Sequence, residues 1–216
     1  NLQAFTKWVP QPGPMTRPIV EHNIAISLRR MGVDSLDLLQ FHWWDYQDAA
    51  YLDALTHLSH LRDAGQLKHL ALTNFDTARL QVITEHGIRV VSNQVQYSLI
   101  DLRPEVRMVP FCQDKNISLL TYGTLCGGLL SEAYLGQPEP RSATLNTASL
   151  RKYKQMIDAW GGWELFQELL QVLQQIADKH GVSIANIAVR AILELPAVAG
   201  GIVGVLLGGA DHHTDN

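Results

Sequence analysis

Short apolar segments alternate with longer amphipathic segments along the whole chain, and this alternation restricts the fold more than any other feature. The short segments are continuous apolar runs, which are typical of strands buried on both faces of a parallel sheet. Six of them are expected to be strands: Ala4–Thr6, Leu36–Phe41, Leu67–Leu72, Val90–Gln94, Ile117–Thr121 and Ala199–Val203. Six longer segments are expected to be helices: Ile19–Met31, Ala49–Ala64, Thr77–His86, Pro104–Asp114, Trp163–His180 and Ser183–Leu193. Repeated strand–helix units predict an α/β fold with a parallel sheet.

The spacing of the strands favours a closed barrel over an open sheet. The first five expected strands start 23 to 32 residues apart, and a (β/α)8 barrel of about 250 residues has about 31 residues in each unit. A doubly wound sheet would instead carry Gly-x-Gly-x-x-Gly directly after a strand, and the sequence has no such motif. We therefore predict one domain over residues 1–216, an incomplete (β/α)8 TIM barrel with about six of its eight units. The Gly-, Pro- and Ser-rich segment 123–142 fits either a loop that covers a cofactor or a disordered connection.

Composition and charge argue against several classes of partner. The chain has 21 acidic and 17 basic residues and a formal net charge of −4. Its basic residues are scattered, so no nucleic-acid partner is expected, and the short cluster Arg151, Lys152 and Lys154 is expected to be a solvated helix face. No apolar run reaches the roughly 18 residues of a membrane span, and Cys112 and Cys126 lack redox or metal-binding spacing. These features are typical of a cytoplasmic protein with free thiols.

Polar side chains stand at the carboxyl ends of five expected strands. In a (β/α)8 barrel this is where the βα loops begin and where catalytic groups lie. The side chains are a lysine, a histidine, two amides and a tyrosine: Lys7, His42, Asn74, Gln94 and Tyr122. Each one alone has a structural interpretation, such as a surface charge or a helix-capping turn. Because five of them occur at five strand ends, we expect them to converge on one mouth, where they suit a carbonyl substrate and an amide-bearing cofactor.

Several motifs resemble those of the aldo/keto reductase family and occur in that family's order. Residues 32–43 (Gly-Val-Asp-Ser-Leu-Asp-Leu-Leu-Gln-Phe-His-Trp) look like the signature that leads into its catalytic histidine. Residues 73–75 (Thr-Asn-Phe) are similar to its Ser-Asn-Phe motif, and residues 93–95 (Asn-Gln-Val) to its Asn-Gln-x motif. Residues 121–129 are similar to the segment after its seventh strand, and residues 202–216 resemble the region that holds the adenosine end of the cofactor.

The resemblance implies an NAD(P)H-dependent oxidoreductase that transfers a hydride between nicotinamide and a small aldehyde, ketone or alcohol. Lys7 matches the lysine that lowers the pKa of a catalytic tyrosine, and His42 matches the histidine that orients and polarises the substrate carbonyl. Trp43 and Trp44 then line the substrate pocket. The matching cofactor-binding residues are Thr73, Asn74, Gln94, Tyr122, His212, Asp215 and Asn216. The cofactor is expected to be NADP, and NAD stays open because Leu206 stands where related sequences often carry arginine or serine.

One departure from the family pattern concerns the proton donor. The family's catalytic tyrosine, and the aspartate that pairs with the lysine, both precede the lysine, whereas only six residues precede Lys7 here. We therefore expect a fragment that lacks the first two β–α units and the C-terminal end, and that is inactive alone.

Two other interpretations remain open at this stage. One is a non-catalytic, cofactor-binding regulatory subunit of the same superfamily. The other is an unrelated barrel such as a hydrolase, which would carry carboxylates or metal ligands at its strand ends. His57 and His60 lie one turn apart on an expected helix, but they have no third ligand nearby, so no metal site is expected.

Overall fold

The computed structural model describes residue 3 and residues 5–204. Within these residues six parallel strands form one sheet, in the order β1-β2-β3-β4-β5-β6. The strands are β1 (Phe5–Trp8), β2 (Leu36–His42), β3 (Leu67–Thr73), β4 (Ser92–Gln96), β5 (Ser118–Tyr122) and β6 (Val198–Gly201). The same residues form the α-helices α1 (Arg17–Met31), α2 (Tyr51–Asp63), α3 (Thr77–Glu85), α4 (Arg103–Lys115), α5 (Ala148–Trp160), α6 (Gly162–His180) and α7 (Ile184–Leu193). Three short 3-10 helices lie between β5 and α5: η1 (Cys126–Gly128), η2 (Glu132–Tyr134) and η3 (Ser142–Thr144).

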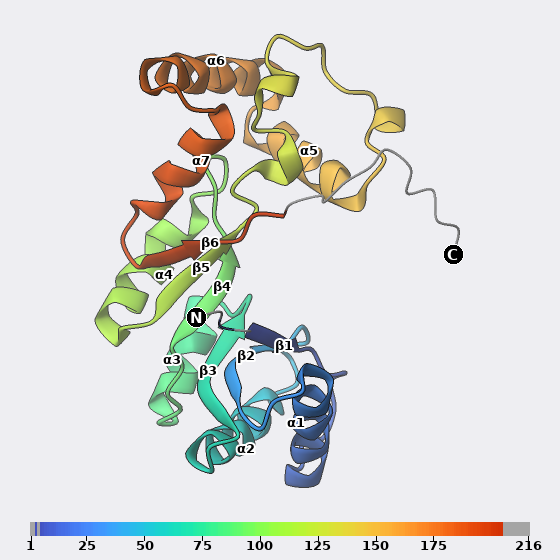
Figure 1. Ribbon diagram of the computed structural model, residues 1–216, viewed down its shortest axis with the longest axis vertical. Coiled ribbons are helices and arrows are strands. Elements are labelled where there is room, and N and C mark those ends of the chain that lie inside the picture. Colours follow the sequence, from blue (N-terminus) through green and yellow to red (C-terminus); the bar gives the residue numbers. More distant parts are fainter. Residues whose placement is uncertain (1–2, 4, 205–216) are drawn as a thin grey trace.

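The strand order identifies the kind of sheet. A doubly wound sheet reverses its order at a switch point, whereas each strand here pairs with the one that follows it in the chain. This is the strand order of a (β/α)8 barrel, and it confirms the predicted α/β fold with six parallel strands. The first units lie at one end of the molecule, with α1 and α2, and α5 and α6 lie at the other end (Figure 1).

The side chains that point away from the inside of the curved sheet form the main core. Leu39, Phe41 and Trp43 alternate along β2 and just beyond it, and all three are fully buried. The Phe41 ring lies 6.0 Å from the Trp43 ring and 6.1 Å from the Phe75 ring, centroid to centroid. This aromatic packing holds the carboxyl ends of β2 and β3 together, which fixes the loops that follow them. Within the described residues no helix has the length and apolar character needed to cross a membrane.

A second cluster joins η1, α5, α6 and α7, and α5 is not among the six helices that the apolar pattern predicted. In α5, Thr147 caps the amino-terminal end by accepting a hydrogen bond from the backbone N–H of Leu150. The buried face of α5 includes Lys154, which is only 7% exposed and is bonded to Glu139 and Asp158. The expectation of a solvated basic face over residues 151–154 is therefore wrong for Lys154.

The segment after β5 is packed, so its interpretation as a disordered connection is not supported. Leu129 and Leu130 are fully buried in the second cluster. The side chain of Glu132 accepts a hydrogen bond from the backbone N–H of Ile184, 2.6 Å away at the start of α7. These contacts tie the segment to the helices that follow it.

Candidate functional site

A row of polar side chains lines the inner face of the sheet at its carboxyl end. Paired residues of neighbouring parallel strands point to the same side, and residues two apart on one strand share a face. The register pairs are Lys7 with Gln40, His42 with Thr73, Thr73 with Gln94, and Gln96 with Tyr122. The row therefore runs across five strands as Lys7, Gln40, His42, Thr73, Gln94, Gln96 and Tyr122. This polar inner face at the strand ends is the candidate site, and it is called the mouth below.

Hydrogen bonds between side chains join distant parts of the mouth. The Nζ of Lys7 donates to the Oε1 of Gln94 at 2.7 Å, across the inner face from β1 to β4. The Nε2 of Gln94 donates to the Oε1 of Gln40 at 3.3 Å. Lys7 and Gln94 are 87 positions apart in the chain, so this contact depends on the curvature of the sheet. A lysine ammonium, which serves only as a donor, is thus held at a defined place in the mouth.

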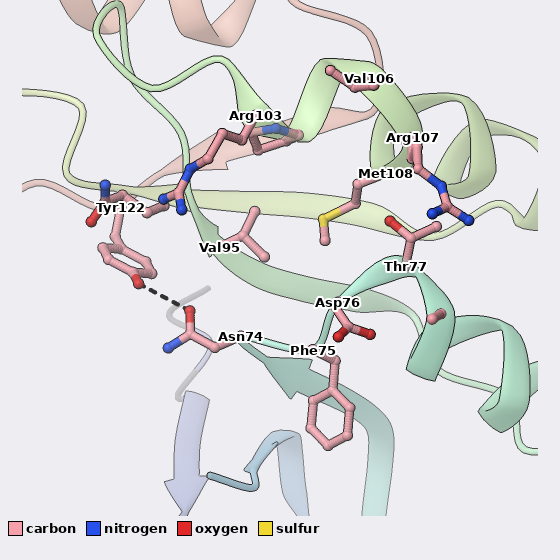
Figure 2. A pocket seen from close by; sticks show the side chains of 13 residues that line it. Asn74, Phe75, Asp76, Thr77, Val95, Arg103, Val106, Arg107, Met108 and Tyr122 are labelled. Carbon is pink, nitrogen blue, oxygen red and sulfur yellow. Dashed lines mark hydrogen bonds between the residues drawn. The ribbon is translucent and has the colours of Figure 1, made fainter. Parts of the chain in front are cut away.

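Asn74, directly after β3, connects three of the strand ends. It has a φ of 61°, in the left-handed region. Its backbone N–H donates to the carbonyl of Gln94 at 2.8 Å, and its backbone carbonyl accepts from the Tyr46 hydroxyl at 2.9 Å. Its side-chain Oδ1 accepts from the Tyr122 hydroxyl at 3.0 Å (Figure 2). Asn74 therefore fixes the position of the Tyr122 ring at the edge of the mouth.

The electrostatics of the mouth favour a neutral histidine. Burial lowers the pKa of His42, and the nearby charge of Lys7 lowers it further. Burial also lowers the pKa of Lys7. Since the ordinary pKa of histidine is about 6.5, a lowered value leaves the imidazole neutral at pH 7. A neutral imidazole carries one N–H donor, which can hydrogen-bond a carbonyl oxygen without adding charge.

Two buried polar atoms in the mouth have no hydrogen-bond partner among the described residues: the Oγ1 of Thr73 and the Nε2 of Gln40. Thr73 is 2% exposed and Gln40 is 5% exposed. A buried polar group without a partner costs roughly 1–3 kcal/mol. A ligand that brings both donors and acceptors, such as a carboxamide, would satisfy these atoms.

The two tryptophans expected in a substrate pocket have different environments. Trp43 is fully buried, and its ring N–H donates to the backbone carbonyls of Asp45 and Asp48. It therefore has no surface that a substrate could contact, because β2 alternation turns it away from the mouth into the core. Trp44 is 53% exposed and donates to the carbonyl of Pro10 at 3.2 Å. Only Trp44 is available to a ligand in this structure.

A further cavity, of about 490 Å³, lies beside the mouth between the loop after β5 and the end of β6. Glycines 123, 127, 128 and 204 line it together with Ser149 and Tyr153 of α5. A Cβ at Gly123 would lie 2.5 Å from the Tyr153 hydroxyl oxygen, and its φ is 75°, so only glycine fits there. Glycine-lined backbone lets N–H groups approach an anion closely.

Four residues of this region had no role in the sequence prediction: Gln40, Tyr46, Gln96, which lies two residues beyond Gln94 on β4, and Lys152. Gln40 and Tyr46 could have been found, because Gln40 is two residues before His42 and Tyr46 lies in the loop that follows it. Lys152 could not have been found, because it lies on α5, which is not among the six expected helices. Its Nζ is 5.3 Å from the centroid of the Tyr122 ring, within reach of a cation–π contact.

Three expected cofactor-binding residues, His212, Asp215 and Asn216, lie outside the described residues. The described part of the chain contains no group of three or more His, Cys, Asp or Glu side chains that could hold a metal ion. The rings of His57 and His60 are 6.0 Å apart.

Comparison with known proteins identifies relatives over almost the whole chain. The profile of the Aldo/keto reductase family matches residues 1–211. The flagellar radial spoke protein 5 of Chlamydomonas reinhardtii is 31% identical over 176 residues, which cover 73% of this chain and 33% of that protein. The chain thus spans about a third of that relative's length.

Solved structures show the same fold. A glycerol dehydrogenase from Gluconobacter oxydans has a TM-score of 0.70 at 22% identity, with 87% of this chain and 56% of that one covered. An aldo/keto reductase from Klebsiella pneumoniae, in complex with NADP and acetate, has a TM-score of 0.66 at 18% identity, with 93% and 59% covered. At these identities the similarity supports a shared fold and nothing more. Six strands in this order are thus a part of a larger barrel in both proteins.

Proposed function

Since the chain belongs to the aldo/keto reductase family of oxidoreductases, we propose that it forms the mouth of a barrel that binds NAD(P)H and reduces a small aldehyde or ketone, or oxidises the corresponding alcohol. One observation carries the proposal. The ammonium of Lys7 reaches across the inner face and donates a hydrogen bond to Gln94, and its charge lowers the pKa of His42. A cation, a neutral imidazole and an amide thereby meet at the carboxyl ends of the strands, where barrel enzymes carry out their chemistry.

The residues of the mouth suit the nicotinamide end of the cofactor, which supplies the hydride when bound. Thr73, Asn74 and Gln94 carry the hydroxyl and amide groups that a carboxamide needs, and the unpartnered Oγ1 of Thr73 fits that role. The Tyr122 ring offers a flat face at the edge, held by its bond to Asn74. The glycine-lined cavity suits the phosphates.

At the adenosine end we propose that His212, Asp215 and Asn216 contact the cofactor. We propose NADP as the cofactor, with NAD as the alternative, because one matched structure contains NADP.

On the substrate side, His42 donates its N–H to the carbonyl oxygen and Trp44 provides apolar contact. Negative charge develops on that oxygen as the hydride arrives, so a nearby ammonium such as that of Lys7 stabilises it. The reaction also needs a general acid that gives the oxygen a proton.

The described tyrosines do not suit the role of this acid. A tyrosine that donates its proton near pH 7 needs a pKa lowered from about 10. Every described tyrosine whose pKa departs from its ordinary value has it raised, chiefly by burial: Tyr46, Tyr51, Tyr97, Tyr122 and Tyr153. We therefore propose that residues 1–216 alone do not reduce carbonyls, and that the acid comes from sequence upstream of Lys7 in the gene product.

NADPH oxidation with a nitrobenzaldehyde tests this proposal, with residues 1–216 compared with a chain that includes the upstream residues. We expect turnover by the extended chain and a rate about 10²- to 10⁴-fold lower for residues 1–216, the range that a positioned general acid contributes. In the extended chain, Lys7→Met and His42→Ala should each lower turnover, and Lys68→Met is a matched control because Lys68 lies on β3 with 61% of its side chain exposed. Equal turnover by the two chains would contradict the assignment of the acid.

A second candidate is a non-catalytic, cofactor-binding regulatory subunit, which needs the polar groups of the mouth but no general acid. It predicts that the extended chain binds NADPH, seen as quenching of tryptophan fluorescence, yet oxidises it no faster than the Lys7→Met variant does.

A further inference from the structure

Another cavity, of about 590 Å³, opens between the amino-terminal ends of α3 and α4 and borders the mouth at Gln96 and Tyr122 (Figure 2). Val95 forms part of its floor, and because Val95 alternates with Gln94 and Gln96 on β4, it points away from the inner face that carries the mouth. Met108 and the exposed Val106 complete the apolar lining. The volume lies within the range of roughly 300–1,000 Å³ that is usual for small-molecule sites.

The wall of this cavity carries positive charge from α4. Arg103 and Arg107 lie one helical turn apart and both line it. The Nε and Nη2 of Arg103 are bonded to the carboxylate of Asp101 at 2.6 and 2.7 Å, which balances its charge. Within the described residues, Arg107 forms neither a salt bridge nor a side-chain hydrogen bond. The guanidinium of Arg107 is therefore an unbalanced cation beside an apolar floor.

The one carboxylate that lines the cavity is already engaged. Asp76 accepts a hydrogen bond from the backbone N–H of Arg79 at 2.8 Å and forms a salt bridge with the Arg79 side chain. Glu105, also on α4, accepts a hydrogen bond from the Tyr97 hydroxyl at 3.0 Å. Glu105 does not line the cavity and Asp76 is paired with Arg79, so among the described lining residues Arg107 is the charge left without an ion pair, and the cavity favours an anion.

We propose that this cavity binds a small organic carboxylate with a flat apolar body. The planar guanidinium of Arg107 matches a carboxylate with two parallel hydrogen bonds, and Met108 and Val95 contact the apolar body. An inorganic anion could use the arginine but not the floor, which is why an aromatic carboxylate fits the lining better than phosphate does. Asn74 and Tyr122 line both this cavity and the edge of the mouth, so an occupant lies against the bond that positions the Tyr122 ring.

The four methionines of the chain allow a direct test by NMR of ¹³C-labelled methionine methyl groups. Met108 lines the cavity, whereas Met15 and Met31 belong to the main core around α1. Titration of residues 1–216 with benzoate should shift the Met108 signal in a saturable way and leave Met15 and Met31 unchanged. Benzamide, which has the same shape without the charge, and inorganic phosphate, which has the charge without the ring, should both bind more weakly.

Substitution of the arginine tests the charge assignment. Arg107→Gln should weaken benzoate binding about fivefold, which corresponds to roughly 1 kcal/mol for a partly exposed ion pair. Arg107→Lys should restore part of the loss, and Arg30→Gln, an exposed arginine on α1, should change nothing. Amide spectra of each variant check the fold.

The proposal is overturned if the Met108 signal does not respond over the millimolar range, if benzamide or phosphate binds as tightly as benzoate, or if Arg107→Gln binds benzoate as the parent does. The measurement uses no nicotinamide cofactor. Its outcome is therefore independent of whether the chain takes part in carbonyl reduction.

Discussion

Replacement of Asn74 should destabilise the chain by an amount that depends on the backbone as well as on the lost side chain. Its φ of 61° lies in the left-handed region, where an ordinary L-residue is disfavoured by about 1–2 kcal/mol and where Asn and Gly are tolerated. Its Oδ1 also accepts the hydrogen bond from Tyr122, 3.0 Å away. This bond is near the surface, so its net contribution is about 0.5–1 kcal/mol.

Two variants of Asn74 separate the backbone contribution from that of the hydrogen bond. Asn74→Ala loses the bond and places a disfavoured residue in the left-handed region, so the free energy of unfolding should fall by about 2 kcal/mol. Asn74→Gly loses the bond but keeps the backbone conformation accessible, so the fall should be about 1 kcal/mol or less. Tyr122→Phe loses only the bond, and the fall should be about 0.5–1 kcal/mol.

Urea unfolding followed by circular dichroism measures all three, together with the double variant Asn74→Ala/Tyr122→Phe. Because both single changes remove the same bond, the double variant should be less destabilised than the sum of the two. The reasoning is refuted if Asn74→Ala is no more destabilised than Asn74→Gly, or if the two single changes add fully.

Two further predictions concern buried groups outside the mouth. Burial raises the pKa of Asp101, but hydrogen bonds from Arg103 and Gln96 outweigh it and hold that pKa below its ordinary value. The contribution of Asp101 to stability is therefore present above the unfolded pKa of about 3.9 and is lost as the pH falls through the folded value. In urea unfolding, Asp101→Asn should be less stable than the parent at pH 6 by about 1 kcal/mol, and this difference should shrink towards pH 3. Trp43→Ala should lower the free energy of unfolding by about 3–5 kcal/mol because the ring is fully buried. Trp44→Ala removes a half-exposed side chain and should change the free energy of unfolding by less than about 1 kcal/mol. Equal losses in the two variants would contradict the placement of Trp43 in the core.

The parallel sheet and its order were predictable because buried strands need apolar side chains on both faces, and such runs stand out in a sequence. The meeting of Lys7 with Gln94 at one end of the sheet was also predictable, since the carboxyl ends of parallel strands in a barrel lie at the same end. The orientation of single side chains was not predictable in this way. Trp43 follows His42 directly, and only strand alternation, which continues past the last residue of β2, sends its ring into the core and leaves His42 in the mouth.

The helix α5 shows a second limit of sequence patterns. Its buried face includes Lys154, whose charge is balanced by Glu139 on the preceding segment and by Asp158 one turn along. The pairing with Glu139 depends on tertiary structure, so the burial of Lys154 could not be read from the sequence around it. Lys152, on the same helix, was missed as a neighbour of Tyr122 because that contact also depends on tertiary structure.

The differences between expected and observed strand bounds have a common physical origin in the mouth. The apolar runs predicted strands that end at Thr6, Phe41, Leu72, Gln94 and Thr121. The observed strands β1 to β5 all end one or two residues later, at Trp8, His42, Thr73, Gln96 and Tyr122. Four of the five extensions add a polar side chain to the inner face: Lys7 on β1, His42 on β2, Thr73 on β3 and Gln96 on β4; on β5 the added residue is Tyr122. A strand that carries such groups keeps its backbone pairing beyond the end of the apolar run by which it is detected. β6, which adds no such residue, instead ends earlier than expected, at Gly201 rather than Val203. In β1 to β5 the apolar run thus stops before the strand does, at the end that carries the mouth.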